Sequence, residues 1–270
     1  MGMGIELFGP GHHEALRRAG RAAAATLAYV AGRLAAGVST GDIDRWVRAD
    51  TERRGGRPSQ LGYHGFPAAV CTSRNHVVCH GIPRDDELLA DGDIVNVDVT
   101  TLLGGFHGDT SATFVVGAAG AQARHLVDVA RRCRDAGVSV VRDGARLGDI
   151  GAAVEEVARA GGCSVVREYG GHGIGRSMHA PPHVPHTGRR GQGLRLRAGM
   201  VLTVEPMVNL GGAEVRVLDD GWTVVTADGS SSAQFEHTVL VTAGGHEILT
   251  APVVTDERAP NAVSKAARLP

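Results

Sequence analysis

The chain has 270 residues, with 28 basic and 29 acidic side chains and a formal net charge of −1 at pH 7. This balance excludes the overall positive field by which proteins attract nucleic acid or anionic lipid, so we expect neither a nucleic-acid partner nor a membrane partner. The 4 cysteines contain no Cys-x-x-Cys pair, which argues against a disulfide scaffold and a thiolate metal site and favours a cytoplasmic location.

Apolar residues recur at helical spacing in four segments that are punctuated by Gly or Pro at their ends. They predict helices over residues 12–35, 41–54, 121–142 and 148–161. Most of the remaining chain is predicted to form strands and turns. We expect residues 1–250 to form a single domain, and residues 251–270, which lose this periodicity, to form a loosely held C-terminal tail.

An internal repeat divides the predicted domain into two related halves. The pattern G-x-x-x-G-D-I-x-x-x-V occurs at residues 37–47 and again at 144–154, each time as a turn that leads into a helix. At the same offset, residues 89–98 correspond to residues 196–205, so Asp98 and Glu205 occupy equivalent positions. We therefore expect two α+β halves, over about 14–117 and 121–242.

Two acids of the first half are predicted to lie together on one face of a hairpin. In the segment DIVNVDV, the valines at 95, 97 and 99 face one way and Asp98 faces the other, as the period of two in a strand requires. If Gly104 and Gly105 form the hairpin turn, Asp98 faces Ser111, and Asp109 is its diagonal neighbour on the same face. The two carboxylates could then touch a common ion.

The second half supplies two more acids, Glu205 in VLTVEP and Glu236 in SAQFEHTVLV, within runs that otherwise predict buried strands. Four carboxylates in one small space would repel one another and raise each other's pKa unless cations compensate them. Two divalent ions would balance the four charges. His172, flanked by glycines, adds one imidazole, and this oxygen-rich set suits Mn, Fe or Co and tolerates Zn.

Six segments make a resemblance to a known family specific, and it extends over about residues 10–250. They are CHGIP at 79–83, NVDVT at 96–100, FHGDTS at 106–111, GGHGIGRSMH at 170–179, TVEPM at 203–207 and FEHT at 235–238. Together they resemble the type I methionine aminopeptidases. The resemblance implies the α+β pita-bread fold of that family, with pseudo-twofold related halves around a central antiparallel sheet.

The resemblance also implies roles for individual residues. Asp98 would be a bidentate ligand of one ion, Asp109 and Glu236 would bridge both ions, and His172 with Glu205 would bind the other. A metal-bridging water or hydroxide would attack the first peptide bond, with Glu205 as proton carrier. His80 and His179 would contact the substrate amide and stabilise the tetrahedral intermediate.

The family's apolar methionine pocket corresponds to five positions of this chain. They are Tyr63, Phe66, Cys71, Met178 and Trp222. Two departures from the family pattern concern the mouth of the site: Ala180 follows His179 where many members carry an acidic residue, and Met178 stands where an aromatic residue is frequent.

The implied function is that of a dinuclear metallo-exopeptidase, a hydrolase and protease that removes the initiator methionine from nascent proteins with a small second residue. The implied partners are the N-termini of nascent polypeptides and, transiently, the ribosome; the implied state is a monomer. The implied cofactors are two divalent ions, Co, Mn, Fe or Zn. Because Gly2 follows Met1, the chain is also expected to process its own N-terminus.

Two other functions share parts of this pattern. An X-prolyl dipeptidase or aminopeptidase P would have the same fold and ligands but usually carries a further N-terminal domain. A peptide-binding protein that has lost catalysis would typically lack several ligands, whereas all five positions are filled here.

Several other His and Cys side chains have simpler interpretations. His12 and His13 are expected to open a surface helix, and His183 and His186 to lie in a Pro-rich loop, without binding metal. Cys79 and Cys71 are interpreted as small packing residues and not as nucleophiles, because no motif places a base beside them.

Overall fold

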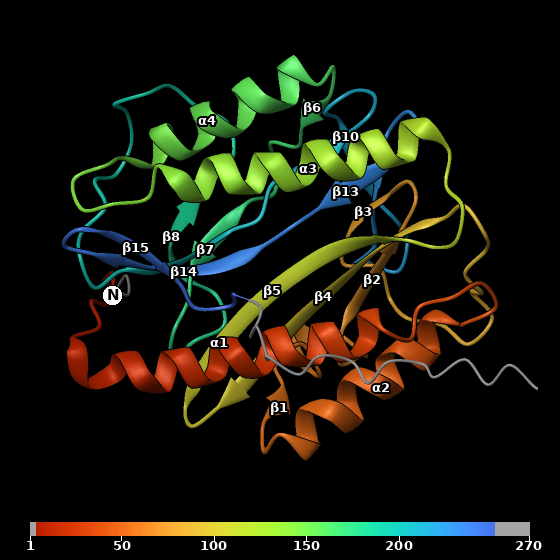
Figure 1. Cartoon of the computed structure of the whole chain (residues 1–270), viewed down its shortest axis with the longest axis horizontal. Helices are drawn as coiled ribbons and strands as arrows, with labels where there is room; N and C mark the ends of the chain where they lie inside the picture. Colours follow the sequence, from red (N-terminus) through yellow and green to blue (C-terminus); the bar gives the residue numbers. More distant parts are fainter. Residues whose placement is uncertain (1–3, 252–270) are drawn as a thin grey trace, which may run out of the picture.

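The computed structural model describes residues 4–251, whose arrangement is shown in Figure 1. Met1 and Gly2, and residues 252–270 of the predicted tail, lie outside the described residues. The four α-helices are α1 (Pro10–Ala31), α2 (Thr40–Arg53), α3 (Ala121–Ser139) and α4 (Leu147–Ala160). None of the helices in the described part of the chain is long and apolar enough to cross a membrane.

The four predicted helices are confirmed to within a few residues at each end. The first ends at Ala31, earlier than the predicted residue 35, where Gly32 caps it. Helix α2 begins at a capping box in which Ser39 accepts from the Asp42 N–H and the Asp42 carboxylate accepts from the Ser39 N–H. In α4 the Asp149 carboxylate accepts from the Arg146 N–H in the same way.

The strands are short, apart from two of ten residues each, and every pairing between them is antiparallel. In the first half they are β1 (Arg57–Pro58), β2 (Cys71–Arg74), β3 (Val77–Cys79), β4 (Ile94–Leu103) and β5 (Phe106–Val115), with a 3-10 turn η1 (Tyr63–Gly65) after β1. In the second half they are β6 (Ser164–Val165), β7 (Gly171–Gly173), β8 (Ala180–Val184), β9 (Val201–Val204), β10 (Met207–Asn209), β11 (Val215–Val217), β12 (Val224–Thr226), β13 (Ser232–Gln234), β14 (His237–Thr242) and β15 (Gly245–Ile248).

The hydrogen-bonded sheet is divided into pieces. One contains β1-β4-β2 with β5 paired to β4, another is ordered β15-β14-β9-β7-β8, and two three-stranded pieces are ordered β13-β10-β6 and β11-β12-β3. Bonds across the seam join the first two pieces: the Glu236 N–H donates to the Ser111 carbonyl at 3.0 Å, and the Thr238 hydroxyl donates to the Asp109 carbonyl at 2.7 Å. Strand β5 of the first half and β14 of the second half therefore lie side by side in one layer.

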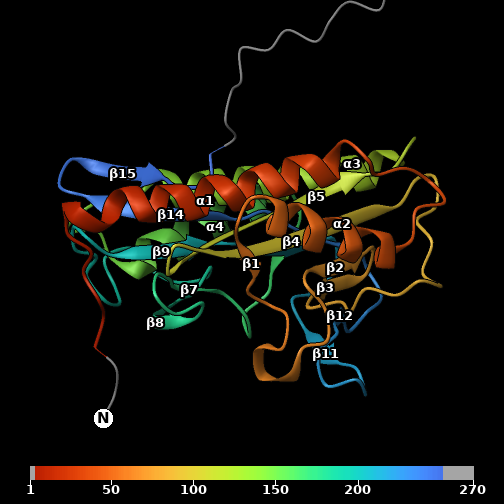
Figure 2. The ribbon, with the colours of Figure 1, turned by 90° about the horizontal axis from the view of Figure 1, so that it is seen from below.

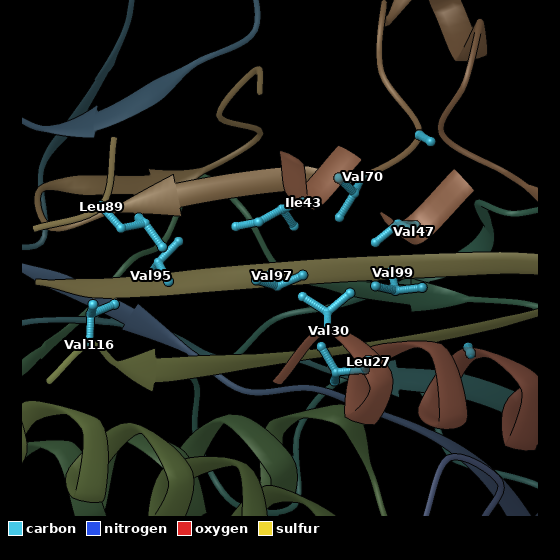
Figure 3. Close-up of a cluster of buried hydrophobic side chains, with 12 residues drawn as sticks. Leu27, Val30, Ile43, Val47, Val70, Leu89, Val95, Val97, Val99 and Val116 are labelled. Atoms are coloured by element: carbon cyan, nitrogen blue, oxygen red, sulfur yellow. The ribbon is translucent and has the colours of Figure 1, made fainter. Parts of the chain in front are cut away.

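Helices cover one face of this layer, and the opposite face carries η1, β7, β8 and β11 (Figure 2). Successive side chains along β4 point to opposite faces of this layer. Val95, Val97 and Val99 are fully buried and pack against Val30 of α1 and Ile43 of α2 (Figure 3). Asp98 lies between Val97 and Val99 along β4 and faces away from these valines, as the alternation predicted.

The sequence repeat is visible in the structure. Helices α2 and α4 both have 14 residues and begin at the corresponding Gly-Asp-Ile segments. Isolated bridges pair Ser39 with Leu88 and Arg146 with Arg195, and these pairs are equivalent under the repeat. Asp98 lies in β4, and its counterpart Glu205 directly follows β9.

Candidate metal centre and substrate pocket

A cavity of about 560 Å³ lies beside β7 and β8, on the side of the sheet that carries no helices. All twelve residues that the sequence predicted for the site line this cavity. They are Tyr63, Phe66, Cys71, His80, Asp98, Asp109, His172, Met178, His179, Glu205, Trp222 and Glu236. Residues from both halves of the chain, more than 170 positions apart at the extremes, thus converge on one space.

The predicted hairpin of β4 and β5 is confirmed. Gly104 and Gly105 form its turn with φ of 60° and 83°, a left-handed conformation that side chains with a Cβ rarely adopt. In the resulting register Asp98 lies opposite Ser111 and Thr100 lies opposite Asp109. Two acids diagonal to each other therefore project from the same face into the cavity.

The second half brings Glu205, Glu236 and His172 to these two acids. Asp109, His172 and Glu236 each place one potential ligand atom within 4.8 Å of the others. The His172 Nε2 atom lies 3.5 Å from Glu205 Oε1 and 3.8 Å from Asp109 Oδ2. The five side chains are four carboxylates and one imidazole, carried by strands or by residues directly beside them, and hard and borderline divalent cations prefer such a set.

The hydrogen bonding of His172 and Glu236 is consistent with metal binding by these five side chains. His172 Nδ1 lies 3.0 Å from the Gly173 carbonyl oxygen, which can only accept, so Nδ1 carries the proton and Nε2 keeps its lone pair toward the acids. Glu236 Oε1 is buried and has no hydrogen-bond partner within the described residues. A cation bound here would accept the lone pairs of His172 Nε2 and Glu236 Oε1.

The electrostatics of the acids point the same way. Burial and the neighbouring Asp109 raise the pKa of Asp98 well above its ordinary value, and burial with the charges of Asp109 and Glu205 does the same for Glu236. Burial raises the pKa of Asp109 to about 7 and, together with Asp109, the pKa of Glu205 to about 8. Without a cation the cluster therefore retains protons at neutral pH, and a cation would displace them.

Buried polar side chains donate hydrogen bonds to the acids and orient them. The sequence did not predict these donor residues. Thr203 accepts from the His172 N–H at 2.9 Å and donates to Glu205 Oε1 at 2.6 Å. Gln234 donates to Glu205 Oε2 at 3.1 Å, and Thr100 donates to Asp109 Oδ1 at 2.8 Å. The available signal was weak: these are polar residues at buried positions of strands that also carry an acid.

His183 and His186 correct an expectation. The Pro-rich segment was predicted to be a loop, but residues 180–184 form β8, in which His183 pairs with His172 and lines the cavity. Strand β8 is at the edge of its sheet, where the missing N–H groups of prolines break no ladder. His186 is buried, and its Nε2 accepts from the Glu205 N–H at 3.0 Å.

The two predicted substrate-binding histidines reach the cavity in different ways. His80 has a left-handed backbone with φ of 56°, and its ring packs edge-on against Tyr169 and Trp222. Burial and His179 lower the pKa of His80 to about 4, so its ring is neutral at pH 7. His179 lies at the open mouth, and its Nδ1 is 2.8 Å from the Tyr63 hydroxyl.

The predicted methionine pocket is apolar where it is deepest. Phe66, Cys71 and Met178 are each at most 5% exposed, and the Phe66 and Trp222 rings meet edge to face at 5.1 Å. Burial and the charge of Asp98 raise the pKa of the Cys71 thiol well above its ordinary value. The buried Cys79 has its pKa raised in the same way, which agrees with packing roles for both cysteines. His12 and His13 lie in the first turn of α1, and neither lines the cavity.

Comparison with known proteins places the chain in a family. The model of metallopeptidase family M24 matches residues 14–243. "Methionine aminopeptidase A" of Synechocystis is 48% identical over 250 residues, which cover 93% of this chain and 99% of the relative. "Methionine aminopeptidase" of Escherichia coli K12 is 47% identical over 249 residues, which cover 92% of this chain and 94% of the relative.

Solved structures agree with this similarity. A methionine aminopeptidase from Rickettsia prowazekii superposes with a TM-score of 0.90 at 44% identity, covering 92% of this chain and 100% of that one. The prolidase from Pyrococcus furiosus, at 19% identity and a TM-score of 0.72, shares the fold alone. These likenesses confirm the predicted α+β pita-bread fold. With the family model matching most of its length, the chain belongs to metallopeptidase family M24.

Proposed function

We propose that this protein is a methionyl aminopeptidase that removes the N-terminal methionine from nascent proteins and peptides with a small second residue. The observation that carries the proposal is one cavity in which an acid and histidine cluster adjoins a buried apolar pocket. Relatives of similar length that are named methionine aminopeptidases support the same activity.

The cluster is proposed to hold two divalent cations through the five side chains Asp98, Asp109, His172, Glu205 and Glu236. Their charges sum to −4 when all four acids are ionised, which two such ions balance. Asp109 and Glu236 are the acids proposed to be shared, because each places a ligand atom within 4.8 Å of the other acid and of His172. When bound, such ions would polarise the scissile carbonyl and supply activated water for hydrolysis.

The protein's own groups would manage the proton and the substrate. Glu205 is the proposed proton carrier between the attacking water and the departing amine; the field of bound cations would lower its raised pKa toward the working range. His80 and His179 are proposed to contact the amide of the scissile bond, one from the cavity wall and one from its mouth. Both would act as neutral rings that donate a hydrogen bond to the developing oxyanion.

Selectivity for methionine is proposed to come from the pocket formed by Phe66, Cys71, Met178, Trp222 and the ring of Tyr63. An unbranched thioether side chain can enter a narrow apolar space without a polar partner. A bulky second residue would meet the histidines on either side of the scissile bond, which accounts for the preference for a small one.

Peptide hydrolysis tests the proposal and separates it from its alternatives. Protein freed of metal by a chelator should be inactive on Met-Ala-Ser and gain activity when Mn, Fe, Co or Zn is restored. Preferential cleavage before proline would indicate an X-prolyl peptidase. Stoichiometric metal binding without hydrolysis of any such peptide would indicate a binding protein, and both results would refute the proposed function.

We further propose that the enzyme acts in the cytoplasm as a monomer and meets its substrates at the ribosome. The substrate supports this, since N-termini of nascent chains are presented there. Exposed arginines on two paired segments, Arg142 and Arg146 on one and Arg195 and Arg197 on the other, would supply local positive charge for the contact. Salt-sensitive cosedimentation with ribosomes, weakened by Arg195→Glu with Arg197→Glu, would test it.

A further inference from the structure

One hydrogen bond in the cavity joins the mouth of the site to a loop from the other half of the chain. The Tyr63 hydroxyl in η1 lies 2.8 Å from Nδ1 of His179, and the two rings are 5.0 Å apart between centroids. The interpretation of Tyr63 as part of the apolar wall gives no role to this hydroxyl. The hydroxyl contacts the ring nitrogen of His179 that would not face the substrate, and this position suggests a role for it.

The chemistry of the two groups determines which of them donates. A neutral imidazole has one N–H and one lone pair, whereas a phenol can both donate and accept. The phenol oxygen is the weaker acceptor, because its lone pair is delocalised into the ring, and the bond to His179 is the one hydrogen bond of this hydroxyl among the described residues. The O–H therefore donates to Nδ1, and the proton of His179 is left on Nε2.

The loop that carries Tyr63 is built to hold this geometry. Gly62 precedes η1 and Gly65 ends it, with φ of 80° and 90°, and His64 has a φ of 46°, so the chain turns sharply on both sides of Tyr63. The Gly62 N–H donates to the Phe66 carbonyl at 2.8 Å and closes the loop.

The same loop is anchored to the strand that carries Asp98. The buried side chain of Gln60 donates from Nε2 to the Asp98 carbonyl at 2.9 Å and accepts from the Thr100 N–H at 3.2 Å. The position of the Tyr63 hydroxyl is thus fixed relative to the metal centre, and not only relative to its own turn.

We propose that Tyr63 is a positioning residue that fixes His179 as the Nε2–H tautomer and so presents a hydrogen-bond donor to the carbonyl of the scissile bond. The inference rests on the proposed function, in which His179 stabilises the oxyanion. In the other tautomer Nε2 would offer a lone pair, which would repel the developing negative charge. The hydroxyl would therefore act through His179, while the ring of Tyr63 remains part of the pocket wall.

Tyr63→Phe tests the proposal because it removes the hydroxyl and keeps the ring. We expect kcat for Met-Ala-Ser to fall by about tenfold or more, with metal content and thermal stability unchanged and KM altered little, since the wall is intact. Tyr29→Phe, at a site where the phenol has no catalytic neighbour, is the matched control. In a His179→Ala background, Tyr63→Phe should cause no further loss; an additive loss would overturn the proposal.

A spectroscopic measurement decides the tautomer without relying on activity. In zinc-loaded, 15N-labelled protein, long-range proton–nitrogen correlations should identify Nε2 of His179 as protonated and Nδ1 as the lone-pair nitrogen. Tyr63→Phe should shift this toward a mixture of tautomers. A protonated Nδ1 in the wild type would refute the inference, whereas failure to cleave any methionyl peptide would refute the proposed function and leave the tautomer result standing.

Discussion

Replacing Glu236 by Gln should stabilise the metal-free protein at slightly alkaline pH while destroying its capacity to load metal. Burial and the charges of its acidic neighbours raise the pKa of Glu236 well above its ordinary value, so the folded metal-free protein keeps this proton at pH values above the ordinary carboxyl pKa. The unfolded chain, with an ordinary carboxyl pKa, has lost it. The folded state then binds more protons, and its free energy of unfolding falls as the pH rises.

The size of the effect follows from proton linkage. Each carboxyl that is protonated only in the folded state lowers the free energy of unfolding by about 1.4 kcal/mol per pH unit. Gln has the same shape and no proton to lose, so the variant should gain about this amount over the wild type for each pH unit in that window. For a chain of this size, this corresponds to roughly 3 to 6 °C in Tm.

The window avoids an opposing contribution from histidines. Burial lowers the pKa of His186 and of His237 to about 3, so these rings are neutral when folded. The stability they contribute is complete above their unfolded pKa, and it is lost as the pH falls. Between pH 7 and 8 they add no slope, and they cancel in any case when variant and wild type are compared.

Calorimetry of chelator-treated protein at several pH values measures the difference. Glu247→Gln is the matched control, because Arg17 holds the pKa of Glu247 below its ordinary value and its replacement should cost a constant amount across the window. Added Mn²⁺ should remove the pH slope of the wild type and leave Glu236→Gln nearly unaffected. A Glu236→Gln advantage that does not grow with pH would mean that this carboxyl is already ionised in the folded protein.

Three further outcomes test the assignment of the site. Asp109→Asn should lower the affinity for Mn²⁺ by about a hundredfold or more, measured by calorimetric titration, and abolish turnover; full activity at modest metal concentration would contradict a ligand role. His179→Ala should reduce kcat about 10²- to 10³-fold while metal content, measured by atomic emission, stays normal; loss of metal would place His179 among the ligands instead. The kcat/KM for Met-Ala-Ser should exceed that for Leu-Ala-Ser by about tenfold or more, and similar values would indicate a general aminopeptidase.

The parts of the fold that could be predicted are those governed by local pattern. The Gly104-Gly105 pair and the alternating valines determined the hairpin, and with it the pairing of Asp98 with Ser111. The repeated Gly-Asp-Ile segments located two helices, and in both copies the Asp carboxylate accepts a hydrogen bond from the N–H of the N-cap residue. The proposed ligand positions were predicted from motifs, each of which contains its own acid or histidine.

What escaped prediction depends on contacts between segments that are distant in the sequence. The bond from the Glu205 N–H to His186 and the bond from the His172 N–H to Thr203 join residues that are 19 and 31 positions apart. No local pattern marks a threonine or a histidine as the support of a particular carboxylate. The left-handed backbone of His80 is likewise a product of tertiary packing, because residues other than glycine rarely adopt that conformation.

The seam between the two halves explains why a cluster of buried acids can persist in this fold. The hairpin of β4 and β5 supplies Asp98 and Asp109, and the residues beside β9 and β14 supply Glu205 and Glu236. Each half therefore supplies two of the four acids in the cluster. The backbone bond from Glu236 to Ser111 fixes the second pair against the first. The closed structure therefore holds the four carboxyl groups together, and those that ionise without a cation repel one another. Cations bound there would convert this repulsion into an attraction between the halves, so metal affinity and the closure of the fold would be expressions of the same free energy.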